Sequence, residues 1–202
     1  MDDLGAPIPV DREELGLVAE NQPDTPNSFQ RRQARKVGGP SDEMMTPPWL
    51  FEQMAIQFDL DVCAPTGGVE WVPAQQHYDL EADGLTLPWV GRVWMNPPYG
   101  NSSPWVTKFM KHRNGIALLP HSRSWWHTEL WADADGMCDP NFTNPHKRLF
   151  QFIHPETLKL TNVYMPVVLA AYGAESVAAI ARVGIVRTVL VFQRREGIGH
   201  VI

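Results

Sequence analysis

Helical and extended hydrophobic patterns alternate along the chain after residue 45. At the start of the first helical pattern, Thr46 is a favourable N-cap and Pro47 stands at the favoured first position of a helix. The apolar residues that follow recur every three or four positions, and they are Leu50, Phe51, Met54, Ala55 and Phe58. This spacing predicts a helix over the segment.

Short strands are predicted where apolar residues alternate with polar ones or form brief buried runs. In "FDLDVCAP" (58–65), two apolar residues alternate with Asp59 and Asp61, and Pro65 ends the run. Further predicted strands are "RVWMN" (92–96), "GIALLP" (115–120), "KRLFQFI" (147–153), "YMPVVLAAYG" (164–173) and "IVRTVLVFQ" (185–193). Further predicted helices are "SPWVTKFMKHR" (103–113), "SWWHTELWADADG" (124–136, ended by Gly136) and "AESVAAIARVG" (174–184, ended by Gly184). Residues 68–89 give no assignable pattern.

The alternation of strands and helices predicts an α/β fold with a mostly parallel sheet. The strand-rich later part of the chain predicts an antiparallel C-terminal edge on that sheet. Ligands bind beyond the carboxyl ends of the strands in open α/β sheets. Asp61 and Asn96 both end predicted strands, so we expect them at this ligand-binding edge.

Charge is distributed unevenly along the 202 residues, whose net charge is −6. Residues 1–27 hold seven acidic side chains and one basic one, so the rest of the chain is neutral. We therefore expect residues 1–40 to be a flexible tail, first acidic and then basic, ahead of one domain over residues 41–202. The basic part contains Arg31, Arg32, Arg35 and Lys36. It is either a phosphate-binding arm or a solvated linker.

Two cysteines, Cys63 and Cys138, lack the spacing of metal ligands, which indicates free thiols in a reducing cytoplasm. The histidines show no ligand spacing either, so no metal is expected. No stretch has the length and apolarity of a membrane span, and the acidic N-terminus lacks the apolar core of a signal peptide.

The stretch "VWMNPPYGN" (93–101) has the composition of a rigid corner after a strand. Pro97 and Pro98 fix their own φ angles and push the preceding residues toward extended geometry. The amide oxygen of Asn96 and the backbone carbonyl of Pro97 could accept both hydrogens of a nucleobase amine and stabilise the positive charge that develops as it is methylated. Tyr99 offers a face on which an extruded base could rest.

Five ordered segments carry a resemblance to a known family: "DEMMTPPWLF", "FDLDVCAP", "DGLTLPW", "RVWMNPPYG" and "GIALLP". Together they resemble the bacteriophage-type DNA N6-adenine methyltransferase family, over roughly residues 41–170. The resemblance implies a Rossmann-like class I methyltransferase fold, with S-adenosylmethionine as cofactor and the N6 amine of a flipped DNA adenine as acceptor. It also implies a cytoplasmic enzyme, in the host bacterial cell if it is phage-encoded.

The resemblance assigns cofactor-binding roles to particular positions. Asp61 would bind the amino group of the cofactor, and Asp83 with Leu85 would contact its adenine. The complete implied cofactor set is Thr46, Pro47, Asp61, Cys63, Asp83 and Leu85. The residues themselves leave two alternatives open: Asp61 as a solvent-facing strand end, and Asp83 as an ordinary turn residue before Gly84. Glu70 is the nearest candidate for the acid that binds the ribose.

DNA contacts are expected from the basic segment, Trp105 and Arg123. Trp105 lies just beyond the corner and is expected in the pocket wall. Arg123 neighbours Trp125 and Trp126, which form either a nucleic-acid surface or part of the core. The chain has no long insert for reading base edges, so tight sequence specificity is not expected.

Two departures from this interpretation remain. The glycine-rich loop of many cofactor-binding methyltransferases is missing after Asp61. The catalytic tetrapeptide alone also suits cytosine N4, an adenine in RNA or a protein glutamine, and the chain could be a catalytically inactive DNA-binding relative.

Overall fold

A computed structural model describes residues 44–140, 150–162 and 166–188. The predicted tail, with its four basic side chains, lies outside these residues. The helices are α2 (Pro48–Met54), α3 (Ser102–His112), α4 (Trp125–Asp133) and α5 (Ala174–Ile180), with a 3-10 turn η1 (Tyr99–Asn101). The strands are β1 (Phe58–Asp61), β2 (Ala74–His77), β3 (Val93–Met95), β4 (Gly115–Pro120), β5 (Gly136–Cys138), β6 (Gln151–Ile153), β7 (Leu160–Asn162), β8 (Val167–Tyr172) and β9 (Val186–Thr188).

A mixed seven-stranded sheet forms the centre of the fold, in the order β2-β1-β3-β4-β8-β5-β9. The first four strands in this order pair in parallel. The pairs β4–β8, β8–β5 and β5–β9 are antiparallel. The sequence prediction of an α/β sheet with an antiparallel C-terminal part is therefore confirmed.

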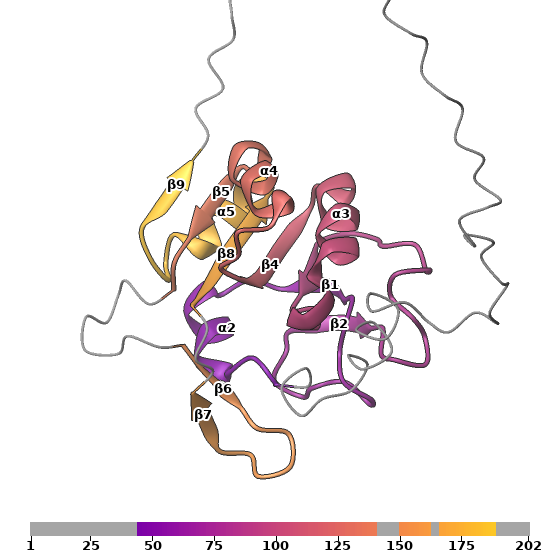
Figure 1. Cartoon of the computed structure of the whole chain (residues 1–202). Helices are drawn as coiled ribbons and strands as arrows, with labels where there is room; N and C mark the ends of the chain where they lie inside the picture. The colour runs from indigo at the N-terminus through magenta and orange to yellow at the C-terminus, as the bar shows by residue number, and fades with distance from the viewer. Residues whose placement is uncertain (1–43, 141–149, 163–165, 189–202) are drawn as a thin grey trace, which may run out of the picture. The chain divides into compact units, whose positions relative to one another are not determined.

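Helices cover both faces of this sheet, as expected for a sheet whose central strands β3, β4 and β8 are buried along their whole length. One buried cluster joins α3 and α4 to one face, with Trp105, Val106 and Phe109 of α3 and Leu130 of α4. The other joins α2 and α5 to the opposite face. In Figure 1, α3 and α4 lie next to each other over the middle strands.

A separate hairpin of β6 and β7 extends away from the main sheet (Figure 1). It is attached through a bridge in which the backbone N–H of Ile153 donates to Met45 at 2.9 Å and that of Met45 donates back at 3.0 Å. The segment "KRLFQFI" was expected in the central sheet, but its described part, β6, pairs with β7 instead.

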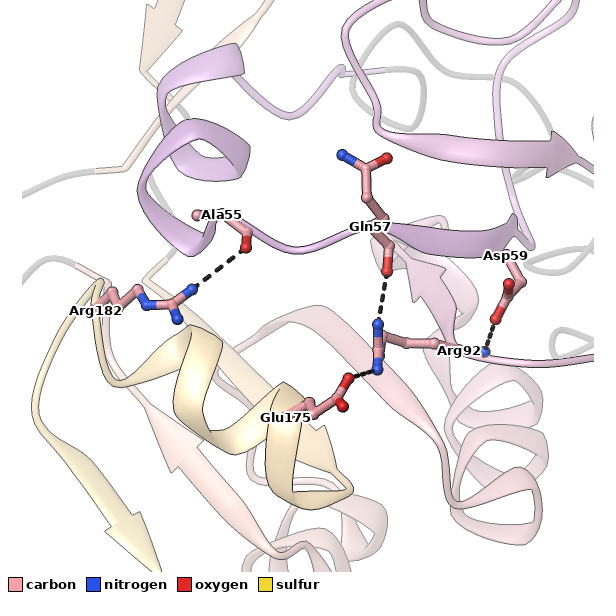
Figure 2. Close-up of polar contacts among 6 residues, drawn as sticks. All are labelled: Ala55, Gln57, Asp59, Arg92, Glu175 and Arg182. Atoms are coloured by element: carbon pink, nitrogen blue, oxygen red, sulfur yellow. Dashed lines mark hydrogen bonds and ion pairs between the residues drawn. The ribbon is translucent and has the colours of Figure 1, made fainter.

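Charged side chains pair where β1 and β3 begin, and we call this side of the sheet the amino edge (Figure 2). The backbone N–H of Arg92 donates to Asp59 Oδ2 at 2.6 Å. The Arg92 guanidinium donates to the carbonyl oxygen of Gln57 at 3.0 Å and to the carboxylate of Glu175 on α5. These contacts join α5 to the start of β1.

Two more arginines lie at the amino edge. Arg182, just after α5, donates to the carbonyl oxygen of Ala55 at 3.4 Å (Figure 2). Arg113, just before β4, forms a salt bridge with Asp133 at 2.8 Å, and its guanidinium lies 4.7 Å from the ring centroid of Tyr172. The amino edge is thus linked by ion pairs and by bonds to carbonyl groups.

The boundaries of the first helix differ from the prediction at both ends. Pro47 is the N-cap of α2 and Pro48 its first residue, so Thr46 does not cap the helix. The helix ends at Met54. Its C-cap, Ala55, donates its N–H to the carbonyl oxygen of Phe51 and has a left-handed backbone (φ 47°), which turns the chain out of the helix. Phe58 consequently lies in β1, although its spacing also fits the helix.

Other elements also differ from the prediction. Helix α4 ends at Asp133, and Gly136 begins β5 instead of ending the helix. Helix α5 ends at Ile180, before the predicted Gly184. Strands β2, β5 and β7 were not predicted. Most residues of β2 and β7 are polar and exposed, and β5 has only three residues.

Candidate active site

The carboxyl edge of the sheet brings the ends of β1 and β3 together. The two strands are parallel neighbours, with Asp61 aligned with Trp94. Asn96 therefore follows β3 on the same edge at which β1 ends in Asp61. Cys63 connects the two ends further, because its thiol accepts a hydrogen bond from the backbone N–H of Asn96.

The side chain of Asn96 has one satisfied and one unsatisfied polar atom. Its Nδ2 donates to the carbonyl oxygen of Met44 at 3.2 Å. A carbonyl can only accept, so this bond fixes which end of the amide points toward Met44. Its Oδ1 is buried and has no hydrogen-bond partner within the described residues. Buried acceptors are nearly always paired, so this oxygen is suited to a donor from a bound molecule.

The Pro-Pro-Tyr segment is held in place by the start of α3. The hydroxyl of Ser102 lies 3.3 Å from the carbonyl oxygen of Pro98 and 3.4 Å from that of Tyr99. The Tyr99 ring packs edge-on against Phe152, with 6.0 Å between the ring centroids. Its buried hydroxyl lacks a partner in the described residues, and burial raises the pKa of this phenol well above its usual value.

Asp61 is buried, with 5% of its surface exposed, and not a solvent-facing strand end. Its carboxylate accepts the backbone N–H of Cys63 at 3.2 Å. None of the ion pairs among the described residues includes it. Burial raises its pKa to about 7, partly offset by the bond from Cys63. A cationic ligand group would stabilise the ionised form of this carboxylate.

Both cysteines are free thiols. Burial, followed by the nearby charge of Asp61, raises the pKa of Cys63 well above its usual value. The thiol therefore stays protonated at neutral pH and is a poor nucleophile.

The segment before α2 also reaches the carboxyl edge. Thr46 is 3% exposed, and its buried hydroxyl has no partner within the described part of the chain. Its carbonyl oxygen accepts the indole N–H of Trp71 at 2.8 Å. Pro47 follows directly, and Met44 contacts Asn96, so this segment lies close to the corner.

The loop over residues 83–87, which we call the DGL loop, lies against the end of β1. A Cβ atom on Gly84 would lie 1.9 Å from the carbonyl oxygen of Val62, so only glycine allows this approach. Asp83 is exposed, and its carboxylate accepts the backbone N–H of Leu85 at 3.2 Å. Leu85 packs against the core. Asp83 thus forms the turn, and the loop is next to Asp61 in the chain fold.

The predicted DNA-contacting residues differ in their exposure. Trp105 is only 9% exposed, so it offers DNA little surface. Its ring stacks on that of Trp89, just after the DGL loop, with 6.4 Å between the ring centroids. Arg123 is exposed in the loop after β4. Trp126 belongs to the core, whereas Trp125 is 53% exposed. The four basic residues of the tail lie outside the described residues.

Asp79 was missed by sequence reasoning. It follows the end of β2 at the carboxyl edge, where backbone N–H groups of Glu81 and Ala82 each donate to it at 3.1 Å. Bonding, chiefly from the Ala82 N–H, lowers its pKa. Glu70, the predicted candidate, is exposed and precedes β2. The strand before Asp79 is polar, so no alternation marked this position.

Residues 44–140, 150–162 and 166–188 contain no group of three or more His, Cys, Asp or Glu side chains arranged to hold a metal ion. Their helices are too short or too polar for a membrane span.

Similarity to known proteins identifies the family of the chain. A model of the family described as DNA N-6-adenine-methyltransferase (Dam) matches residues 35–163, more than half of the chain. The DNA N-6-adenine-methyltransferase of Haemophilus phage HP1 (strain HP1c1) is 38% identical over 87 residues, which cover 39% of this chain and 49% of that protein. The match thus spans about half the length of this curated relative. No solved structure matches the chain. The extent of the family match shows that the chain belongs to the DNA N-6-adenine-methyltransferase (Dam) family.

Proposed function

We propose that this protein transfers a methyl group from S-adenosylmethionine to the N6 amine of an adenine flipped out of DNA. The mixed sheet would then be a Rossmann-like class I methyltransferase core. The observation that carries the proposal is the buried, unpaired Oδ1 of Asn96, held in place by the bond from its Nδ2 to Met44.

Asn96 would act on the acceptor amine. The lone pair of an exocyclic amine is delocalised into the base, so the amine is a weak nucleophile. Asn96 Oδ1 and the carbonyl oxygen of Pro97 would accept its two hydrogens, which favours a tetrahedral nitrogen and stabilises the developing positive charge. Tyr99 would support the extruded base with its ring. Because Ser102 holds this segment, the acceptors need little reorganisation.

The remaining residues of the carboxyl edge fit the cofactor. S-adenosylmethionine supplies an electrophilic methyl group on a sulfonium. Asp61 is a buried carboxylate without a cation among the described residues, which suits an ammonium group. Thr46 has a free hydroxyl at the same edge, and the DGL loop would contact the adenine through Asp83 and Leu85. Asp79 replaces Glu70 as our candidate for binding the ribose hydroxyls, and Cys63 lines the space between Asp61 and Asn96.

DNA would reach this edge from the side of the exposed Arg123. The basic side chains of the tail would add phosphate contacts.

The test is the substitution Asn96→Ala. We expect kcat for methyl transfer to fall by about 100- to 1,000-fold, because a preorganised polar group facing the developing charge is lost. Calorimetric affinity for S-adenosylmethionine should remain within about twofold. Asn114→Ala, at an exposed asparagine of the amino edge, is the matched control and should retain full activity.

The product is identified by mass spectrometry of nucleosides from treated DNA. N6-methyladenine supports the proposal. Methylation at cytosine N4 alone, no modified nucleoside, or an Asn96→Ala variant that is as active as the wild type would each contradict it.

A further inference from the structure

Lys108, in the middle of α3, donates hydrogen bonds to several carbonyl groups of the DGL loop. Its ammonium donates to the carbonyl oxygens of Gly84 at 2.9 Å and Leu85 at 3.0 Å, and also to that of Leu87. Three acceptors satisfy all three N–H groups of a lysine. The ammonium also lies 5.0 Å from the ring centroid of Trp89, within range of a cation–π contact.

The loop held by Lys108 has no regular secondary structure of its own between β2 and β3. Within it, the backbone N–H groups of Thr86 and Leu87 bond to the carbonyl oxygen of Asp83, and side chains from outside the loop add further contacts. The carbonyl oxygen of Gly84 also accepts the indole N–H of Trp89 at 2.7 Å. The carboxylate of Asp83 accepts the backbone N–H of Leu85, within the loop. Lys108 therefore supplies most of the bonds that join this loop to a helix.

The same helix also holds the catalytic corner. Ser102, its first residue, bonds to the carbonyl oxygens of Pro98 and Tyr99. Lys108 lies six residues further along, which corresponds to about 9 Å of helix. Helix α3 thus contacts the corner through Ser102 and the DGL loop through Lys108.

We propose that Lys108 is a positioning residue that orients the DGL loop for binding the adenine of the cofactor. The inference rests on the proposed function, in which this loop contacts that adenine. Lys108 does not touch the reacting atoms. It acts by orienting the loop backbone, and thereby Asp83 and Leu85, toward the ring.

The experiment measures, by calorimetry, the binding of the demethylated cofactor and of an analogue that differs from it only in the base. S-adenosylhomocysteine carries the 6-amino group of adenine, and S-inosylhomocysteine carries an oxo group in its place. We expect wild-type protein to prefer the adenine compound by at least about tenfold. Lys108→Met should weaken S-adenosylhomocysteine binding about tenfold and reduce the preference to about twofold or less.

Two further variants separate positioning from general stability. Lys108→Arg keeps the charge but has a planar donor group that fits three converging carbonyls poorly, so we expect an intermediate preference. Lys111→Met, at an exposed lysine of the same helix, is the matched control and should bind both compounds as the wild type does. If Lys108→Met does not fold, the intermediate preference of Lys108→Arg carries the test.

The outcomes distinguish this inference from the proposed function. Wild-type protein that binds neither compound would overturn both. A wild type with the preference, and Lys108 variants that retain it unchanged, would overturn the role of Lys108 and leave the proposed function intact. A wild type that binds both compounds equally would overturn the placement of adenine in the DGL loop, and with it the role of Lys108.

Discussion

Asp59 and Asp61 stand two residues apart on β1, at opposite edges of the sheet, and their surroundings differ in kind. Asp59 accepts the backbone N–H of Arg92, whose guanidinium bonds to Glu175 and Gln57. Asp61 is buried with no cation in the described ranges, and burial raises its pKa to about 7. Both carboxylates accept one backbone N–H, but only Asp61 is buried, and no ion pair among the described residues compensates its charge.

The difference separates an edge of the sheet that stabilises the fold from an edge that is suited to binding a ligand. At the amino edge, the guanidinium groups of Arg92 and Arg113 pair with carboxylates of the chain. At the carboxyl edge, the charge of Asp61 and the acceptor of Asn96 have no such partner, a combination typical of ligand-binding sites. Unpaired atoms alone would not show this, because Arg92 Nε at the amino edge is also unpaired. The two edges differ in that only the carboxyl edge has a buried carboxylate, Asp61, without an ion-pair partner among the described residues.

The strongest way to break the comparison is the substitution Asp61→Asn. It removes the charge that would bind the ammonium of S-adenosylmethionine, so we expect calorimetric affinity to fall by about 100-fold. It also removes an uncompensated buried carboxylate, so the free energy of unfolding of the ligand-free protein at pH 8 should rise by about 1–3 kcal/mol. Denaturant unfolding measures the second effect. Unchanged affinity, or a less stable variant, would contradict the assignment of Asp61 to a ligand.

At the amino edge, Arg92→Met should lower stability and leave activity unchanged, the opposite of what we expect for Asp61→Asn. It keeps the aliphatic stem but removes the bonds to Gln57 and Glu175, so the free energy of unfolding should fall by about 1–3 kcal/mol. The kcat of the folded enzyme should not change, because the site lies at the other edge. Glu175→Gln is the milder control, since the Glu175 side chain is 77% exposed and an exposed ion pair contributes about 1 kcal/mol or less. A large loss of kcat in Arg92→Met would show that the two edges are not separate.

A further test of the same carboxylate is the pH dependence of stability. In the folded protein Asp61 keeps its proton up to a pH of about 7, whereas in the unfolded chain it loses it near its ordinary value of 3.8. Folding is therefore favoured by this group below pH 4, and its contribution is lost as the pH rises toward 7. Relative to Asp61→Asn, the wild type should lose stability between about pH 4 and pH 7 in thermal unfolding. Parallel curves for the two proteins would exclude a raised pKa.

Much of the fold follows from apolar patterning. Helix α3 and strands β1, β3 and β4 form where buried residues recur at the right period, and each was predicted. Strand β2 was not predicted because its sequence "AQQH" is largely exposed. It is an outermost strand of the sheet and pairs only with β1. Phe58 satisfies both periods, and only the left-handed backbone of Ala55 decides that the helix ends before it.

The site was predictable to a similar degree. The two prolines and Asn96 identified the corner, and the strand order placed Asp61 beside it. The contacts that hold these residues use main-chain carbonyls of Met44, Gly84 and Leu85. A carbonyl is present at every residue, so no pattern of side chains shows which one will be used. The role of Lys108 was missed for this reason.

Contacts between distant parts of the sequence determine the order in which the site is completed during biosynthesis. Asn96 is anchored to a carbonyl 52 residues upstream, while the support of Tyr99 comes from Phe152 on the hairpin attached at Ile153. A nascent chain that has emerged only as far as α3 already contains Asp61 and the loop around Gly84, yet lacks that hairpin. The half of the site that would hold the methyl donor is therefore synthesised first, and the half that would present the acceptor is finished last.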